Sequence, residues 1–508
     1  MVRQAACVGV LVVAALVLLV GCTGDQRSSG SASGSARADS SARPSAGTQP
    51  ATADAPDSGF PTDWVPTPLR WSRCELPREG RCATLAVPLD WSDPEGSSIE
   101  LAVGRIPARG ARTGALLINP GGPGASGLEF LSFDPVSDTL ADQFDLISWD
   151  PRGVGASAPL SCGDDVGRLR AADPDPDTED EQAELDAAAA SIASDCAASD
   201  AALLPHLGTR DVARDMEAIR RALGGEQLNY LGFSYGTQIG QQYAQMFPGR
   251  IRAMALDAVV DPDQGFEEFL LGQAVAFEDS FAISAAGCAA AGTDECGVED
   301  LGDAYDRVRA MVERSPLRGG DEPVGPSALA TATILSNYGA EGWTELGPAL
   351  AAALEGDGGP LWELAASYYE LGGFTSYAAV VCTDTAPPAG ADAYRAFADE
   401  ARDRAPRFGG SVANELAPCA TWPADAIGVP SPVTAAGAPP ILVIGNTGDP
   451  ATPYRNAVDV AASLESGVLV TVESDGHTAY LDSTCVTAIV DDYLVALEVP
   501  QQDTVCSS

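Results

Sequence analysis

Six short apolar runs along the chain predict the strands of a buried sheet. Each run has four to six residues and is bounded by turn-forming residues, which is typical of strands. The runs are 114–119, 144–149, 228–232, 251–256, 441–444 and 468–472. Helical patterns lie between several of them, and the amphipathic run Asp211–Leu223 ends at Gly224 and Gly225, with Thr209 as its predicted N-cap. This alternation predicts an α/β fold with a mostly parallel sheet and helices on both faces.

Two intervals do not fit this alternation. The region from about Cys162 to Ala201 is Asp-rich, and we expect a solvated excursion there. The interval 263–435 is rich in Ala and Gly and is too long for one crossover connection. We therefore predict that 263–435 forms a mainly helical cap, inserted into a core made of 60–262 and 436–508.

The N-terminal segment has the features of an export signal. Residues 1–22 carry Arg3, then an apolar stretch too short to be typical of a membrane-spanning helix. Leu19-Val20-Gly21-Cys22 resembles a bacterial lipobox, in which the cysteine is acylated. Residues 23–59 are mostly Ser, Ala, Gly, Thr and Pro, which predicts a flexible linker. We expect a lipoprotein anchored to the cell membrane outside the cytoplasm; a plain signal peptide with an incidental cysteine is the alternative.

The net charge of the chain is compatible with export. The formal net charge is −43 and the chain contains no Lys, so we expect no nucleic-acid partner. The acidic excess fits the solubility of an exported protein, while salt adaptation and selection of cationic substrates remain open.

Ten cysteines remain once Cys7 and Cys22 are set aside, an even number that predicts disulfides. Pairing them in sequence order would give five short-range bridges, the last joining Cys485 to Cys506, although the sequence does not determine the connectivity. With two His and no C-x-x-C pair in the chain, we expect neither a metal nor another cofactor.

The segment Gly232-Phe233-Ser234-Tyr235-Gly236 matches G-x-S-x-G, the turn that presents a nucleophilic serine between a strand and a helix. A serine hydroxyl needs an imidazole to accept its proton. His477 follows the last predicted strand and is the expected base, whereas we expect His206, which precedes the serine, to be structural. The expected acid is Asp449, at the end of the strand that begins at Ile441, with Asp257 and Asp261 as alternatives.

An oxyanion hole should follow the first predicted strand. The loop Asn119-Pro120-Gly121-Gly122-Pro123-Gly124 lies there. Pro123 has no N–H, so Gly122 is the expected backbone donor, with Gly121 as the second choice. The residue after the nucleophile, Tyr235, is the other expected donor.

Five motifs, taken in order, resemble those of the actinobacterial tripeptidyl-aminopeptidase-like enzymes, relatives of the proline iminopeptidases. They are NPGGPGASG (119–127), WDPRGVG (149–155), GFSYG (232–236), GDPATP (448–453) and GHT (476–478). The resemblance implies an α/β-hydrolase fold with a helical cap, and an exported serine peptidase or esterase that releases short peptides from a free N-terminus. The iminopeptidases' H-G-G-P-G is P-G-G-P-G in this chain, which argues against strict prolyl specificity.

The leading functional hypothesis is a monomeric aminopeptidase that releases di- or tripeptides. Its cap should supply carboxylates that bind the substrate's ammonium group, and Glu267, Glu268 and Asp384 are the candidates. A carboxylesterase with the same triad is the second hypothesis. A substrate-binding lipoprotein without catalysis is the third.

Overall fold

The computed structural model describes residues 58–162, 166–320, 322–339, 341–370, 373–428 and 430–507. The predicted signal segment, Cys22 and the predicted linker up to residue 57 lie outside the described residues.

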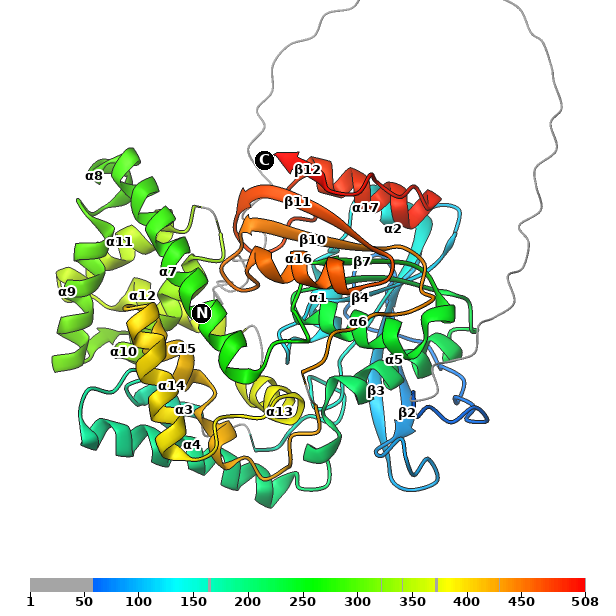
Figure 1. The fold of residues 1–508 in the computed structure, drawn as a ribbon, viewed down its shortest axis with the longest axis horizontal. Helices are drawn as coiled ribbons and strands as arrows, with labels where there is room; N and C mark the ends of the chain where they lie inside the picture. Colours follow the sequence, from blue (N-terminus) through cyan, green and yellow to red (C-terminus); the bar gives the residue numbers. More distant parts are fainter. Residues whose placement is uncertain are drawn as a thin grey trace, which may run out of the picture. The chain divides into compact units, whose positions relative to one another are not determined.

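A ten-stranded sheet forms the centre of the core (Figure 1). Its order is β1-β2-β3-β5-β4-β6-β7-β10-β11-β12, and the pairs from β5 onwards are parallel, while β1, β2 and β3 are antiparallel to their neighbours. The strands are β1 (Ser72–Arg73), β2 (Arg81–Pro88), β3 (Ser98–Ile106), β4 (Gly114–Asn119), β5 (Phe144–Trp149), β6 (Leu228–Phe233), β7 (Ile251–Asp257), β10 (Ile441–Gly448), β11 (Gly467–Asp475) and β12 (Thr504–Ser507). The expected α/β-hydrolase fold with its mostly parallel sheet is confirmed.

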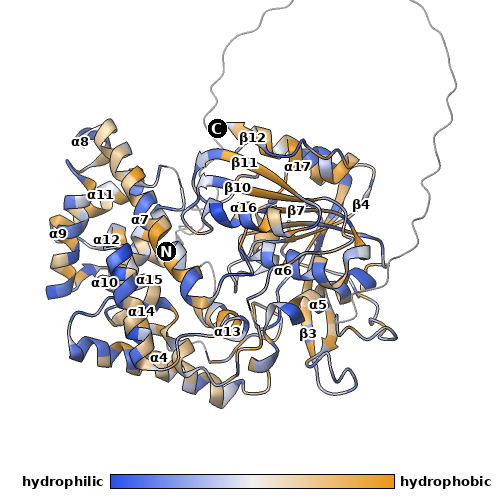
Figure 2. Cartoon of the chain, viewed as in Figure 1, coloured by the Kyte–Doolittle hydropathy of each residue, from blue (hydrophilic) through white to orange (hydrophobic). Residues whose placement is uncertain are grey.

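Helices cover both faces of this sheet. Alternate strand residues point to opposite faces, so Leu117 and Val443 pack with one helical layer, and Leu116 and Leu442 with the other. The first layer consists of α5 (Thr209–Ala222), α6 (Tyr235–Met246) and α16 (Tyr454–Ser463). The second consists of α1 (Gly127–Ser132), α2 (Asp138–Gln143) and α17 (Thr484–Ala496). The central strands are accordingly among the most hydrophobic segments in Figure 2.

The interval between β7 and β10 is mainly helical. Its helices are α7 (Phe266–Ala291), α8 (Thr293–Cys296), α9 (Leu301–Arg314), α10 (Pro326–Ser336), α11 (Trp343–Leu354), α12 (Gly359–Glu370), α13 (Phe374–Asp384), α14 (Ala391–Arg404) and α15 (Gly409–Glu415), with a small hairpin of β8 (Leu317–Gly319) and β9 (Glu322–Val324). These elements, which we call the cap, share a hydrophobic cluster of their own.

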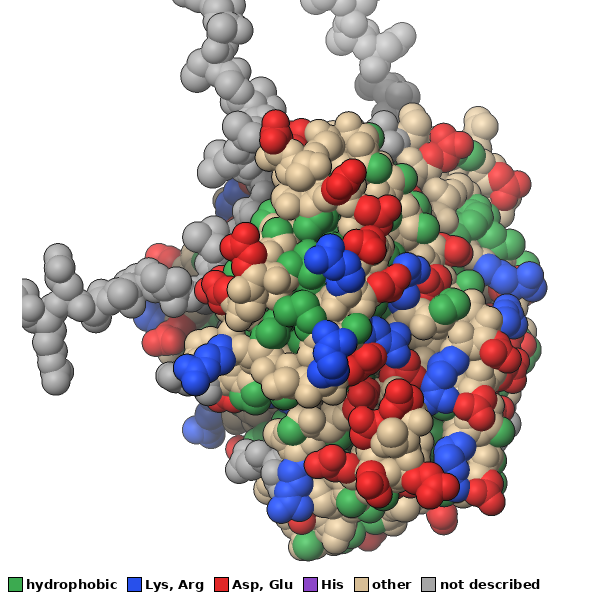
Figure 3. Space-filling view, turned by 90° about the vertical axis from the view of Figure 1, so that its left-hand side faces the viewer, with side chains coloured by type: hydrophobic (Ala, Val, Ile, Leu, Met, Phe, Trp, Pro, Cys, Tyr) green, Lys and Arg blue, Asp and Glu red, His purple; other side chains and the backbone are tan. Residues whose placement is uncertain are grey.

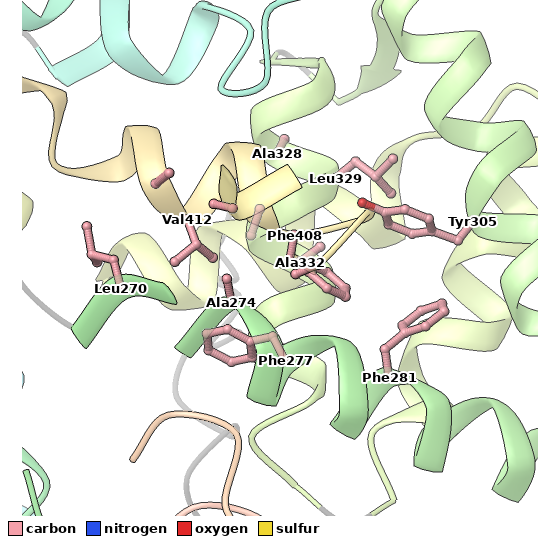
Figure 4. Close-up of a cluster of buried hydrophobic side chains, with 14 of the residues drawn as sticks. Leu270, Ala274, Phe277, Phe281, Tyr305, Ala328, Leu329, Ala332, Phe408 and Val412 are labelled. Atoms are coloured by element: carbon pink, nitrogen blue, oxygen red, sulfur yellow. The ribbon is translucent and has the colours of Figure 1, made fainter. Parts of the chain in front are cut away.

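Helix α7 is the long apolar helix of the cap. By length and composition it could cross a membrane, but Leu270, Ala274, Phe277 and Phe281 are buried in the cap cluster. Their spacing places them along one side of the helix, and Figure 4 shows them facing the other residues of the cluster. The helix is therefore a structural element of the cap.

The Asp-rich region before the serine is not a solvated excursion. It contains α3 (Val166–Ala171) and α4 (Glu179–Ser199). Helix α4 begins with a capping box at Thr178 and Glu181, and one face of it is buried, including Leu185 and Ile192. The Ala residues between its acidic positions permit this close packing, and α4 lies against the 3₁₀ turn Ala417–Thr421 that follows the cap helices.

Five disulfides join the ten cysteines in sequence order, so the expected disulfides are present. They are Cys74–Cys82, Cys162–Cys196, Cys288–Cys296, Cys382–Cys419 and Cys485–Cys506.

Charges of both signs are interspersed on the face drawn in Figure 3. Many Arg side chains have carboxylate partners; Asp175, for example, pairs with both Arg309 and Arg402, at N–O distances of 2.7 and 2.5 Å. Local pairing of this kind reduces repulsion among neighbouring carboxylates, while the net charge remains −43.

Candidate active site

Ser234 occupies the tight turn between β6 and α6. Its backbone has φ 52° and ψ −126°, a left-handed conformation that a side chain rarely adopts. The flanking glycines are required by close packing, because a Cβ at Gly232 would lie 2.6 Å from the carbonyl oxygen of Gly236, and one at Gly236 would lie 2.6 Å from that of Asn119. The turn therefore presents the Ser234 side chain at the carboxyl end of the parallel strands.

His477 and Asp449 lie together on the loops that follow β11 and β10. The His477 Nδ1 atom is 2.9 Å from Asp449 Oδ1 and 3.0 Å from Oδ2. The buried Asp449 carboxylate also accepts the backbone N–H groups of Ala451, at 2.9 Å, and Thr452, at 2.8 Å, and the Thr452 hydroxyl at 3.0 Å. These hydrogen bonds fix the carboxylate so that it can orient the imidazole.

The electrostatics of His477 favour its protonated form. Burial lowers the pKa of His477, but the charge and hydrogen bond of Asp449, with a smaller effect of Asp257, outweigh burial and raise the pKa above its ordinary value. A base with a raised pKa accepts a proton more readily.

Ser234 and His477 both line a cavity of about 390 Å³. Among the described residues, no hydrogen bond joins the Ser234 hydroxyl to the His477 ring. Such a bond is often long in an enzyme without substrate and tightens when substrate binds. The three side chains thus have the order and loop positions of a Ser–His–Asp triad.

Asp257, one of the alternative candidates for the acid of the triad, binds the backbone of the loop that carries His477. It accepts the backbone N–H groups of Ala479, at 3.0 Å, and Tyr480, at 2.8 Å, and it makes no hydrogen bond to the His477 ring within the described structure. Burial raises the pKa of Asp257 to about 6. Asp257 therefore holds the loop that carries His477, a function that its position at the end of a strand did not reveal.

The predicted oxyanion donors lie beside Ser234. The Gly121 N–H donates to Asn119 Oδ1 at 2.9 Å and is thereby occupied, which leaves Gly122 as the loop donor. Gly122 lines the cavity with Ser234, and Tyr235 is the first residue of α6, where an N–H has no acceptor within the helix. A Cβ at Gly121 would lie 2.8 Å from the Tyr235 nitrogen, so the two segments are in close contact.

Glu415 is the carboxylate that the cap contributes to this cavity. It ends α15 and accepts a 3.4 Å hydrogen bond from the Tyr377 hydroxyl. Tyr338 and Tyr368 also line the cavity, and besides burial the nearby charge of Glu415 raises the pKa of both phenols. Burial raises the pKa of Glu415 itself to about 7. The local sequence does not distinguish this residue, because the run 411–416 (SVANEL) mixes polar and apolar residues.

The three carboxylates expected to bind substrate lie elsewhere. Glu267 and Glu268 are exposed in the first turn of α7 and do not line the cavity. Asp384 lines a second cavity of about 420 Å³, which also reaches Ser234, and accepts the Thr209 N–H at 2.9 Å and the Thr209 hydroxyl. Burial raises the pKa of Asp384 to about 6. Of the four carboxylates, only Glu415 lines the cavity that contains both Ser234 and His477.

The Asp384 contacts also correct the predicted start of α5. Thr209 is not the N-cap, because its hydroxyl contacts Asp384 and, at 2.6 Å, the Tyr235 hydroxyl. Gly208 occupies the N-cap position without a side-chain hydrogen bond.

His206 does not line the site, whereas the cap contacts it directly. The His206 carbonyl accepts a 3.0 Å hydrogen bond from buried Arg152, and the His206 side chain lines neither cavity. By contrast, the backbone N–H of His477 donates to the Tyr338 carbonyl of the cap at 2.9 Å, and the Tyr338 ring packs edge-on against the imidazole, with ring centroids 5.3 Å apart. The cap is therefore in direct contact with the candidate base.

Comparisons with known proteins agree with this geometry. Residues 114–292 match a family model described as alpha/beta hydrolase fold, and residues 405–506 match one described as TAP-like protein. The chain is 34% identical over 484 residues to the serine protease Hip1 of Mycobacterium tuberculosis, covering 89% of this chain and 92% of the relative. It is 34% identical over 482 residues to the tripeptidyl aminopeptidase of Streptomyces coelicolor, covering 90% and 87%. It is 35% identical over 456 residues to carboxylesterase B of Mycobacterium tuberculosis, covering 85% and 87%.

Proposed function

The chain belongs to the tripeptidyl-aminopeptidase-like family of α/β-hydrolases and is a serine peptidase, and on this premise we propose that it releases di- and tripeptides from free peptide N-termini. The proposal includes the catalytic assignment. Ser234 is the nucleophile, His477 the general base, Asp449 the acid that orients it, and the N–H groups of Gly122 and Tyr235 form the oxyanion hole.

The reaction proceeds in two halves. His477 accepts the Ser234 proton as the hydroxyl oxygen attacks the scissile carbonyl, and the oxyanion of the tetrahedral intermediate receives the two backbone N–H donors. His477 then protonates the leaving amine and the C–N bond breaks. The C-terminal part of the substrate is released, and the N-terminal part stays on Ser234 as an acyl-enzyme. Water activated by His477 attacks the ester and restores Ser234.

The position of Glu415 is the observation that supports specificity for free N-termini. Its carboxylate lines the cavity that holds Ser234 and His477, together with the rings of Tyr338, Tyr368 and Tyr377. A substrate ammonium placed there gains a charge-assisted hydrogen bond to the carboxylate and cation–π contacts with the rings. The substrate is therefore bound by its own N-terminus, and the separation of Glu415 from Ser234 would limit the number of residues released.

The test compares a free-amine tripeptide amide with its N-acetylated twin. Glu415→Gln should lower kcat/KM for the free amine by about 10- to 100-fold, the effect of one charge-assisted hydrogen bond, and leave the acetylated twin little changed. Glu267→Gln, at an exposed carboxylate outside the cavity, is the matched control. Equal turnover of both twins by the unaltered protein would contradict the proposal. In Ser234→Ala, turnover and labelling by a fluorophosphonate should both be lost.

A carboxylesterase is the second candidate, favoured by the 35% identity to carboxylesterase B. The same triad and oxyanion hole cleave esters. An esterase would prefer an uncharged acyl group, so its kcat/KM for a neutral ester would exceed that for any free-amine peptide and would not respond to Glu415→Gln. A substrate-binding lipoprotein without catalysis would not react with the fluorophosphonate at all.

Export and membrane anchoring through Cys22 are the last part of the proposal. The lipobox-like pattern supports it, and so do the five disulfides, which are typical of oxidising compartments. The protein should partition with the cell membrane, and Cys22→Ser should release it. Unacylated protein cut at another position and free in the medium would contradict the anchor.

A further inference from the structure

Among the described residues, the catalytic cavity contains a guanidinium without a carboxylate partner. Arg170, on α3, is the only Lys or Arg among the described residues that line this cavity. Its guanidinium carbon lies 3.9 Å from the centroid of the Tyr369 ring, which lines the same cavity. No carboxylate in the described part of the chain lies within ion-pair distance of Arg170, and Tyr369 is its one electrostatic partner there.

The acidic residues that follow α3 have other partners in the described structure. Asp175 pairs with Arg309 and Arg402, and Asp173 accepts the Asp175 N–H at 2.9 Å. Glu415 lines the same cavity but makes no ion pair with Arg170. The cavity thus presents a carboxylate and a guanidinium at separate points, in a chain whose 72 acidic residues far outnumber its 29 basic ones.

Stacking leaves the guanidinium able to bind a further group. The ring of Tyr369 covers a face of the plane, whereas the five N–H donors of a guanidinium point outward within the plane. Arg170 is half-buried, and burial lowers its pKa, but a guanidinium keeps its charge at neutral pH. A half-buried charge without a partner is unfavourable, and a carboxylate offers the bidentate geometry that matches it.

We propose that Arg170 binds the side-chain carboxylate of an Asp or Glu in the acyl part of the substrate, so that the enzyme prefers acidic peptides at one position before the scissile bond. The proposal rests on the proposed function, since it places the substrate N-terminus at Glu415. The substrate class is then a peptide whose ammonium and side-chain carboxylate are bound at two separate points of one cavity.

The test uses free-amine tripeptide amides that carry Asp, Asn, Glu or Gln at each of the three positions in turn. For the unaltered protein, the acidic member of a pair should have kcat/KM at least about tenfold above its amide at one position. Arg170→Gln should abolish that ratio, and Arg170→Glu should favour Lys at the same position. Arg168→Gln, at an exposed arginine of the same helix that does not line the cavity, should keep the ratio.

A ratio near one at all three positions, or a ratio that persists in Arg170→Gln, would overturn the proposal. Failure of the proposed function is recognised separately, as the absence of peptide cleavage by a protein that still reacts with a fluorophosphonate. In that case, paired esters of succinate and succinamate test Arg170, because their acyl groups differ in the same carboxylate. Equal hydrolysis of the two esters would again contradict it.

Discussion

Asp449 and Asp257 both contact the loop of His477, but they bind different atoms of it. Asp449 faces the imidazole Nδ1, whereas Asp257 accepts backbone N–H groups two and three residues further on. Asp449→Asn should lower kcat by about 10⁴-fold, because the amide favours the wrong imidazole tautomer. Asp257→Asn should lose only about 10- to 100-fold, through a shift of the loop. Kinetics of both variants measure the difference, and equal losses would contradict the assignment.

The pH dependence should differ between substrate classes. His477 must be neutral to accept a proton, and its raised pKa places the acidic limb of kcat/KM above about 6.5. Free-amine peptides also need ionised Glu415, whose pKa is about 7, so their kcat/KM should fall more steeply below that pH. Neutral esters, and free-amine peptides with Glu415→Gln, should show the His477 limb alone. Identical pH profiles in all three cases would contradict a role of Glu415 in substrate binding.

Among single residues, the sequence analysis identified those that belong to a local motif and missed those that reach the site only through folding. Ser234 and His477 could be selected because the nucleophile has a fixed local signature and the chain has two histidines. Glu415 and Arg170 have no such signature, because their proximity to Ser234 arises only when distant segments pack together.

At the scale of elements, helix α17 connects the C-terminus to the candidate site. Asp491 on this helix accepts the Tyr480 hydroxyl at 2.9 Å, and Tyr480 belongs to the loop that follows His477. Cys485 at the start of α17 is joined to Cys506 in β12, the edge strand of the sheet. The bridge therefore restrains the terminal strand and the helix behind the catalytic loop.

Replacing both Cys485 and Cys506 with Ser should lower the free energy of unfolding by about 3 kcal/mol, the chain-entropy value for a loop of this size. Activity should decline at a lower temperature than the loss of global structure, since α17 contacts the His477 loop. Differential scanning calorimetry alongside an activity assay measures both. Replacing Cys74 and Cys82 with Ser, in the region before the sheet's parallel strands, is the control, and an identical effect on activity would argue against a local connection.

The elements that could be predicted were those with uninterrupted apolar runs. β4 and β5 begin and end where the apolar pattern placed them, whereas β2 and β3 were not predicted. Both contain polar or charged residues within them, such as Thr84 and Glu100, because they pair near the edge of the sheet and are exposed on part of their surface. The packing of α4 against the cap was also missed, since its alternating acidic residues obscure the small buried side chains.

At the scale of the whole molecule, buried carboxyl groups should make stability depend on pH. The folded-state pKa of Glu415, about 7, lies above its unfolded value, so folding favours the protonated form. Stability is therefore lost as pH rises from about 4.5 through 7. Glu415→Gln should remove this loss and raise the free energy of unfolding at pH 8 by about 3 kcal/mol, with little change at pH 4.5. Urea denaturation at both pH values measures it; an unchanged or lowered stability at pH 8 would contradict the burial of this charge.

The contact between Tyr338 and His477 joins the cap to the loop of the proposed base. The backbone N–H of His477 donates to the Tyr338 carbonyl, so a cap that swung away from the core would break a hydrogen bond of this loop. With the cap in place, substrates can reach Ser234 through the two cavities that meet there. Loose chain ends fit such a passage, and folded proteins in the same compartment do not. We therefore expect the enzyme to act on unfolded or fragmented chains and to leave folded proteins uncut.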